Sequence, residues 1–146
     1  MDNRSVVSLL ASLTETWINP EAQLRDCSDL VDSDTCRRCL DGHAKSCALV
    51  VNELQQMVRS LGGAPTNARP LAGALRQQWL DVANMLSLTS DSRVLRECLR
   101  CEVSTGFRYR DALAEDLPAS IRLMLERQHL ILLRCQDESK SLSRLH

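Results

Sequence analysis

Residues 34–63 read DTCRRCLDGHAKSCALVVNELQQMVRSLGG, and this stretch sets the fold class. Its apolar residues recur at intervals of three and four, which places them along one face of an α-helix. They are Leu40, Cys47, Val50, Val51, Leu54, Val58 and Leu61. Gly62 and Gly63 follow, and glycine ends helices because it takes the left-handed conformation at low steric cost. The stretch therefore predicts an amphipathic helix over residues 34–61.

Helical spacing recurs on both sides of this stretch, between turn signals at 19–20, 31–34, 62–67, 87–91 and 116–118. It predicts helices over residues 3–18, 71–86, 91–114 and 118–142. Asn19 can cap and Pro20 can occupy a first helical turn, so the first helix can continue, kinked near Pro20, to Leu30. A long crossover between the second and third long helices is typical of the ferritin-like topology. We expect one all-α domain over residues 1–146, a ferritin-like four-helix bundle with a short extra helix in the crossover.

The composition excludes several classes of protein. A chain of 146 residues with 44% apolar residues is too apolar to be wholly disordered and has the size of one domain. Its 18 basic and 19 acidic side chains leave a net charge of −1, which argues against nucleic-acid and membrane-surface partners. There is no apolar block of secretory or membrane-spanning length. We expect a cytoplasmic protein whose seven cysteines, an odd number, are thiols.

A few polar residues fall on the apolar faces of the predicted helices. Glu102 lies in the middle of the apolar stripe of residues 91–114, His43 lies in line with Leu40 and Cys47, and Glu21 lies close to the first stripe. Carboxylates and imidazole that project inward from several helices are the raw material of a metal site in a bundle. Glu21, Glu102 and His43 are therefore candidate ligands for iron, manganese or zinc. Hydrogen bonding to a Tyr, Ser or Arg neighbour is the alternative for each.

The remaining inward polar residues form a candidate polar core of Tyr109, Gln128 and Gln136. The string Glu126–His129 matches the Glu-x-x-His pattern of helical di-iron sites, but Glu126 lies far from the centre of the apolar face. Two Cys-x-x-Cys strings, Cys36/Cys39 and Cys98/Cys101, are candidate thiol pairs for zinc or a disulfide. Both lie in helical sequence without turn residues, so buried thiols that act as small apolar groups are the alternative. No phosphate-binding loop or nucleophile motif is present, which favours a non-enzymatic protein.

Strings along nearly the whole chain are similar to one known family. They are Met1–Val7 with Leu13, Glu15 and Thr16; Glu53–Gln55, Leu61–Gly63 and Pro65; Ala72–Leu75 and Trp79; Leu95, Glu97, Cys98 and Glu102; Tyr109–Leu113; and Leu117, Pro118, Arg127 and Gln128. The chain resembles small uncharacterised bacterial proteins of ferritin-like, four-helix-bundle type, a domain of unknown function. The resemblance implies the bundle fold.

The chain also departs from the pattern of that family. The resemblance implies a Glu where Leu99 stands, a His where Arg76 stands and a His-Asp pair where Gln136 and Asp137 stand. Asn19-Pro20 replaces an Asp-Gly. If the polar core of the family binds metal, this chain has lost ligands at Leu99 and Gln136 and keeps Glu21 and Glu102. The resemblance therefore implies a degenerate metal site, and we expect no bound cofactor.

Three functional hypotheses remain open. The first is a non-enzymatic bundle protein that acts through self-assembly or a protein partner, because Leu123, Leu130 and Leu133 form a second apolar stripe on the last helix. The second is a metal-binding or redox protein of di-iron type. The third is a redox sensor that uses the paired cysteines.

Overall fold

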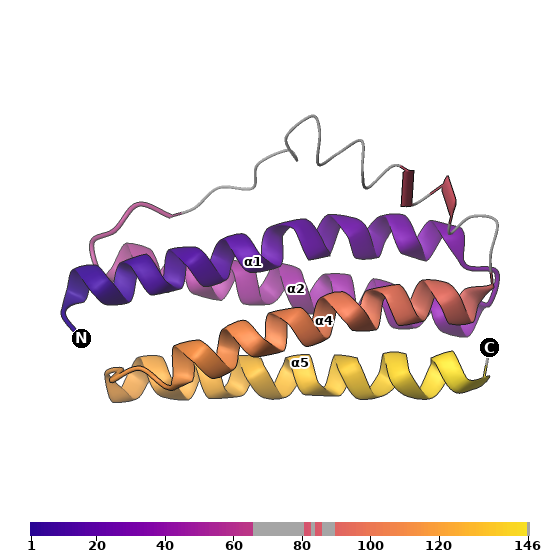
Figure 1. The fold of residues 1–146 in the computed structure, drawn as a ribbon. Coiled ribbons are helices and arrows are strands. Elements are labelled where there is room, and N and C mark those ends of the chain that lie inside the picture. The colour runs from indigo at the N-terminus through magenta and orange to yellow at the C-terminus, as the bar shows by residue number, and fades with distance from the viewer. Residues whose placement is uncertain (66–80, 83, 86–89, 146) are drawn as a thin grey trace.

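Four long helices make up the described part of this protein (Figure 1). The structure, a computed structural model, describes residues 1–65, 81–82, 84–85 and 90–145. The helices are α1 (Asn3–Leu30), α2 (Asp34–Ser60), α4 (Asp91–Leu113) and α5 (Ala119–Leu145), and no strand occurs within those residues. The prediction of an all-α chain with four long helices is confirmed.

Two expected features fall on residues that the structure does not describe or describes only in part. The short crossover helix over residues 71–86 lies mostly among them. Helix α1 continues through Pro20, as the sequence allowed. The side chains of residues 18–20 are not described, and the expected kink falls on these residues.

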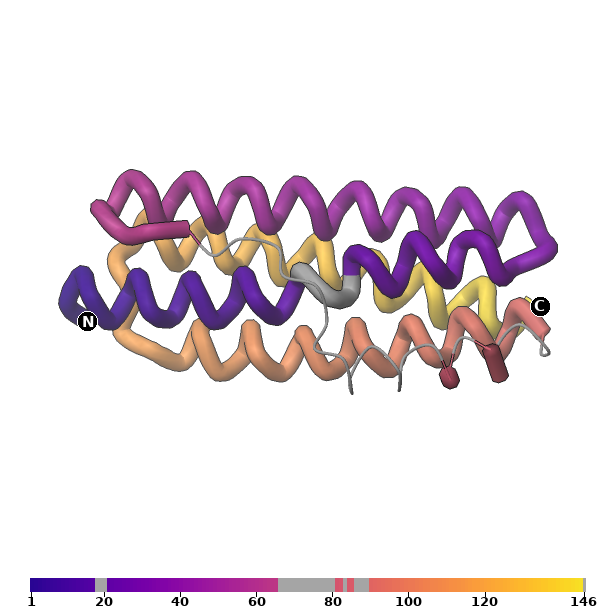
Figure 2. Tube along the Cα trace, turned by 90° about the horizontal axis from the view of Figure 1, so that it is seen from above, coloured from indigo at the N-terminus to yellow at the C-terminus, as the bar shows by residue number. Residues whose placement is uncertain are grey.

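The helices lie side by side with their long axes nearly aligned (Figures 1 and 2). Helices α1 and α2 form one antiparallel pair and α4 and α5 form another, each pair joined by a short turn. Helix α1 also contacts α4, and α2 contacts α5. Helix α4 runs in the same direction as α2, so the end of α2 and the start of α4 lie at opposite ends of the bundle. Helices α2 and α5 run antiparallel and contact each other, so their inward-facing side chains can meet.

Local capping explains where the helices begin. The Asp2 carboxylate accepts a hydrogen bond from Ser5 N at 2.8 Å at the start of α1, and the Ser33 side chain caps α2. Asp91, the first residue of α4, accepts hydrogen bonds from Asp32 N and Ser33 N, both at 2.9 Å. Gly62 follows α2 with a φ of 83°, the left-handed conformation that favours glycine. The turn between α1 and α2 is thus tied to the start of α4.

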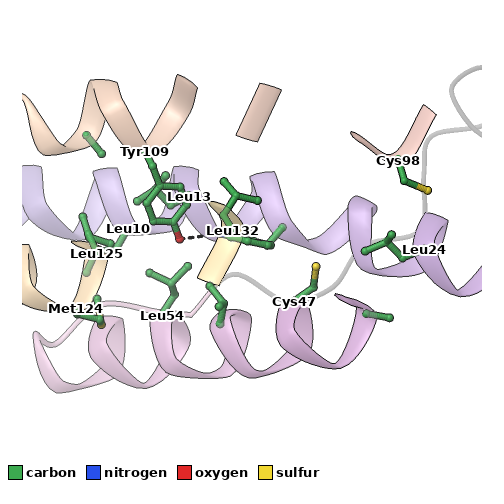
Figure 3. Packing of buried hydrophobic residues seen from close by; sticks show 14 of the residues in the cluster. Leu10, Leu13, Leu24, Cys47, Leu54, Cys98, Tyr109, Met124, Leu125 and Leu132 are labelled. Atoms are coloured by element: carbon green, nitrogen blue, oxygen red, sulfur yellow. Dashed lines mark hydrogen bonds between the residues drawn. The ribbon is translucent and has the colours of Figure 1, made fainter. Parts of the chain in front are cut away.

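The apolar stripes predicted from the sequence form the core. Leu40 and Leu54 of α2, Leu95 of α4 and Leu125 of α5 are fully buried. Tyr109 lies among the leucines of this core (Figure 3). Within the described residues, no helix has the length and apolar character that crossing a bilayer requires.

Candidate metal centre

His43 lies in the bundle interior between two carboxylates from different helices. Its side chain is 4% exposed. Its Nδ1 lies 3.0 Å from Glu102 Oε1 of α4, and its Nε2 lies 3.1 Å from Glu138 Oε2 of α5. The structure therefore brings together two of the three predicted ligands, His43 and Glu102. It adds Glu138, which the sequence did not single out.

Cys39 completes a compact group of ligand atoms with His43 and Glu138. Cys39 precedes His43 by one helical turn, so the two side chains share a face of α2. Cys39 Sγ lies 3.5 Å from His43 Nε2 and 3.9 Å from Glu138 Oε2. The three ligand atoms thus form a triangle, partly open to solvent because the Glu138 side chain is 60% exposed. A sulfur, a nitrogen and an oxygen ligand meet at one place.

Glu102 supports this group from the buried side. Its Oε1 contacts His43 Nδ1 and accepts a hydrogen bond from Ser139 Oγ at 3.2 Å. Gln136 Nε2 donates to the Glu102 backbone carbonyl at 3.1 Å. The Glu102 carboxylate holds Nδ1. In the neutral imidazole, Nε2 is therefore the nitrogen whose lone pair is free to bind an ion. Glu102 therefore orients His43 and does not itself belong to the triangle.

The charge of His43 follows from the same contacts. Burial alone would lower the pKa of His43, but hydrogen bonds with Cys135, Cys39 and Glu102 outweigh burial and raise it. A protonated imidazole suits a position between two carboxylates. A metal ion that binds Nε2 must therefore displace a proton, so binding releases a proton to solvent.

The predicted polar core forms a second network, closer to the other end of the bundle. Trp17 Nε1 donates to the Tyr109 hydroxyl at 2.7 Å, and that hydroxyl donates to Gln128 Oε1 at 2.6 Å. Gln128 Nε2 donates to Glu53 Oε1 at 2.7 Å, and Glu53 pairs with Arg127. Burial raises the pKa of Tyr109, so the phenol stays protonated. Tyr109 and Gln128 lie in this network, whereas Gln136 lies beside Glu102.

Glu21, the third predicted ligand, lies apart from the triangle. Its Oε1 pairs with Arg25 Nη2 at 3.3 Å, one turn along α1. The string Glu126–His129 also gives no ligand pair in the described structure. Glu126 is exposed, and the His129 ring stacks on Tyr109 with centroids 5.9 Å apart.

The two Cys-x-x-Cys strings are separated by the fold. All seven cysteines are free thiols. Cys39 contacts His43, whereas Cys36 is buried near Ser33 at the start of α2. Cys98 lies within hydrogen-bonding reach of Cys27 of α1, and Cys101 lies near Gln23. Each of these contacts joins a cysteine to a residue other than the second cysteine of its own string.

Sequence reasoning missed Glu138 and Ser139, and it placed Cys39 with Cys36 instead of with His43. A signal for the second error was present, because Cys39 and His43 are four residues apart on one helix. Glu138 gave a weaker signal, since its side chain is largely exposed. Its position depends on the register of α5 against α2.

Comparison with known proteins places the chain in a family. The model of the family described as Domain of unknown function (DUF2383) matches residues 5–115. The chain belongs to this family. The match includes α2 and Glu102 but ends before α5, so Glu138 lies outside the matched residues. No curated protein matches the chain.

Proposed function

We propose that this protein is a ferritin-like bundle protein that binds a divalent transition-metal ion, with zinc the best fit, through Cys39, His43 and Glu138. The observation that supports the proposal is the convergence of one sulfur, one nitrogen and one oxygen ligand on a compact triangle. This favours the metal-binding hypothesis over self-assembly as the primary function. The connectivity supports the ferritin-like assignment, because a long connection joins two antiparallel helix pairs.

The dimensions of the triangle suit a tetrahedral ion. With Zn–N and Zn–O distances of about 2.0–2.2 Å and Zn–S of about 2.3 Å, neighbouring ligands in a tetrahedron lie roughly 3.4–3.6 Å apart. The three separations here are 3.1, 3.5 and 3.9 Å. The separation between Cys39 and His43 lies within this range. The two separations that involve Glu138 differ from it by about 0.3 Å, a shift that rotation of the exposed Glu138 side chain can supply. Little reorganisation of the buried His43 is needed.

The chemistry of the ligands supports zinc over harder ions. Magnesium and calcium prefer oxygen ligands, whereas thiolate and imidazole suit zinc and its neighbours in the first transition row. The carboxylate of Glu102 on His43 Nδ1 matches the arrangement in which a carboxylate orients and activates a zinc-bound histidine. Three protein ligands leave one tetrahedral position for water.

A zinc competition titration against a chromophoric chelator tests this proposal. The metal-free protein, purified without a metal-affinity tag, should bind one zinc ion per chain. Glu138→Gln should weaken binding at least about tenfold, because it replaces an anionic ligand at an exposed site where the fold tolerates change. Cys39→Ala should weaken it further.

Asp137→Asn is the matched control, because it removes one negative charge from the exposed neighbour of Glu138. It should bind zinc as the unaltered protein does. Equal affinity in Glu138→Gln and the unaltered protein, or equal loss in Asp137→Asn and Glu138→Gln, would overturn the assignment.

Two further parts of the proposal concern the cellular compartment and the oligomeric state of the protein. We place this function in the cytoplasm, where a reducing environment would keep the seven thiols free. Self-assembly remains a prediction that rests on Leu123 and Leu130, which are 67% and 60% exposed on α5, while Leu133 is half-buried. Light scattering coupled to size-exclusion chromatography tests it, and a strictly monomeric mass would contradict it.

A further inference from the structure

A small cavity lies between the four helices next to the metal triangle, and His43 belongs to both, whereas Cys39 and Glu138 do not line the cavity. Its volume is about 30 Å³, and its walls include Trp17, Leu24 and Leu132. A cavity of this size holds a water molecule or a single ion, since a water needs roughly 10–15 Å³ of such space. The walls are mostly apolar, so a hydrated ion would find few polar groups there to replace its water ligands.

Five of the seven cysteines line this cavity, and each of the four helices contributes at least one. They are Cys27 of α1, Cys47 of α2, Cys98 and Cys101 of α4, and Cys135 of α5. Cys47 and Cys98 lie among the buried hydrophobic residues (Figure 3). Cys27 and Cys98 line the cavity from α1 and α4, two helices that contact each other, and the Cys27 thiol is the partner that raises the pKa of Cys98.

Glu102 adds a second and independent feature to the same cavity. It lines the cavity, and it is 7% exposed. Its Oε1 contacts His43, but its Oε2 is buried and has no hydrogen-bond partner among the described residues. A buried carboxylate oxygen without a partner is costly, and a cation nearby relieves that cost.

Three thiols of the cavity, those of Cys47, Cys98 and Cys101, have raised pKa values and are protonated at neutral pH. Burial raises the pKa of Cys47 to about 12, and burial also raises the pKa of Cys101. The hydrogen bond with Cys27, followed by burial, raises the pKa of Cys98. A ligand that binds these sulfurs must form bonds strong enough to displace their protons. Soft cations bind thiolates in this way.

Coordination number selects among soft cations. Zinc takes four ligands in a tetrahedron, whereas Cu(I) accepts two sulfur ligands in a line. Two thiols of the cavity, Cys27 and Cys98, therefore suffice for Cu(I).

We propose that Cys27 and Cys98 bind Cu(I) between α1 and α4, with the negative potential of Glu102 drawing the cation into the cavity. As the two Cu–S bonds form, two S–H bonds break and two protons pass to solvent. The oxidation state of copper and of sulfur does not change. This site is separate from the zinc triangle, because it uses neither Cys39 nor Glu138.

An anaerobic titration of the reduced, zinc-free protein with Cu(I) tests this proposal, with bicinchoninate as the competing chromophoric ligand. The unaltered protein should withdraw one equivalent of Cu(I) from the chelator. Cys98→Ala and Cys27→Ala should each weaken binding at least tenfold. Cys36→Ala is the matched control, because Cys36 is as deeply buried but does not line the cavity. Circular dichroism of each variant confirms that the helices form.

Two outcomes would overturn the proposal. The first is equal affinity for Cu(I) in Cys98→Ala and Cys36→Ala. The second is loss of Cu(I) binding in Cys39→Ala with full binding in Cys98→Ala, which would move the copper to the triangle. Neither result depends on zinc affinity, so failure of the copper proposal and failure of the zinc proposal are distinguishable. X-ray absorption at the copper edge should show sulfur neighbours only.

Discussion

Glu102 is a positioning residue for the proposed zinc ligand His43, because it holds Nδ1 and so leaves Nε2 free for the ion. Glu102→Gln keeps the size of the side chain and removes its charge. We expect this variant to bind zinc about 10–100-fold more weakly, the usual effect of losing a carboxylate behind a ligating histidine. Competition titration measures the affinity. Unchanged affinity in a folded Glu102→Gln protein would show that Glu102 has no part in the site.

Cys39 differs from the thiols of the cavity in its access to solvent. It is half-buried, whereas Cys47 and Cys98 are buried and their pKa values are raised. The thiolate is the form that reacts with alkylating agents. Iodoacetamide at pH 8 should therefore label Cys39 before Cys47 and Cys98, and zinc should slow the labelling of Cys39. Peptide mass mapping over time reads the order, and prior labelling of Cys47 would contradict it.

At the level of single helices, α2 contains a residue that weakens it. Gly42 lies inside α2, and an added Cβ would meet no atom within 4 Å. Glycine in a helix interior costs roughly 0.5–1 kcal/mol relative to alanine because of its conformational entropy. Gly42→Ala should therefore raise the free energy of unfolding by about that amount.

Gly63 provides the contrasting variant. An added Cβ there would lie 2.7 Å from Val7 Cγ1 and 3.0 Å from Val58 Cγ1, so Gly63→Ala should lower stability. Urea unfolding followed by circular dichroism measures both variants. A destabilised Gly42→Ala protein would mean that the α2 face around Gly42 is covered.

The apolar stripes made the four long helices predictable, because packing rewards a face that repeats every three to four residues. Glu102 and His43 stood out for the same reason, as polar residues on apolar faces. Glu138 did not, since an exposed glutamate on a helix surface looks like any solvated charge. Its place beside His43 is set by the register between α2 and α5, and no residue pattern within either helix encodes that register.

For the whole molecule, zinc should act as a stabilising ligand of the folded state. An ion that binds only the folded chain adds about 2.7 kcal/mol to the free energy of unfolding when its concentration is 100 times the dissociation constant. Urea unfolding with zinc and with a chelator should show this difference for the unaltered protein. Glu138→Gln should show much less of it, whereas Asp137→Asn should retain it. A zinc effect of the same size in all three proteins would indicate binding elsewhere.

The most direct measurement is X-ray absorption at the zinc edge on protein loaded with one equivalent of zinc. We predict one sulfur neighbour at about 2.3 Å and the remaining neighbours, nitrogen and oxygen, at about 2.0–2.2 Å. The sulfur contribution should vanish in Cys39→Ala. A first shell without sulfur, or one made of several sulfurs, would contradict zinc binding at Cys39, His43 and Glu138.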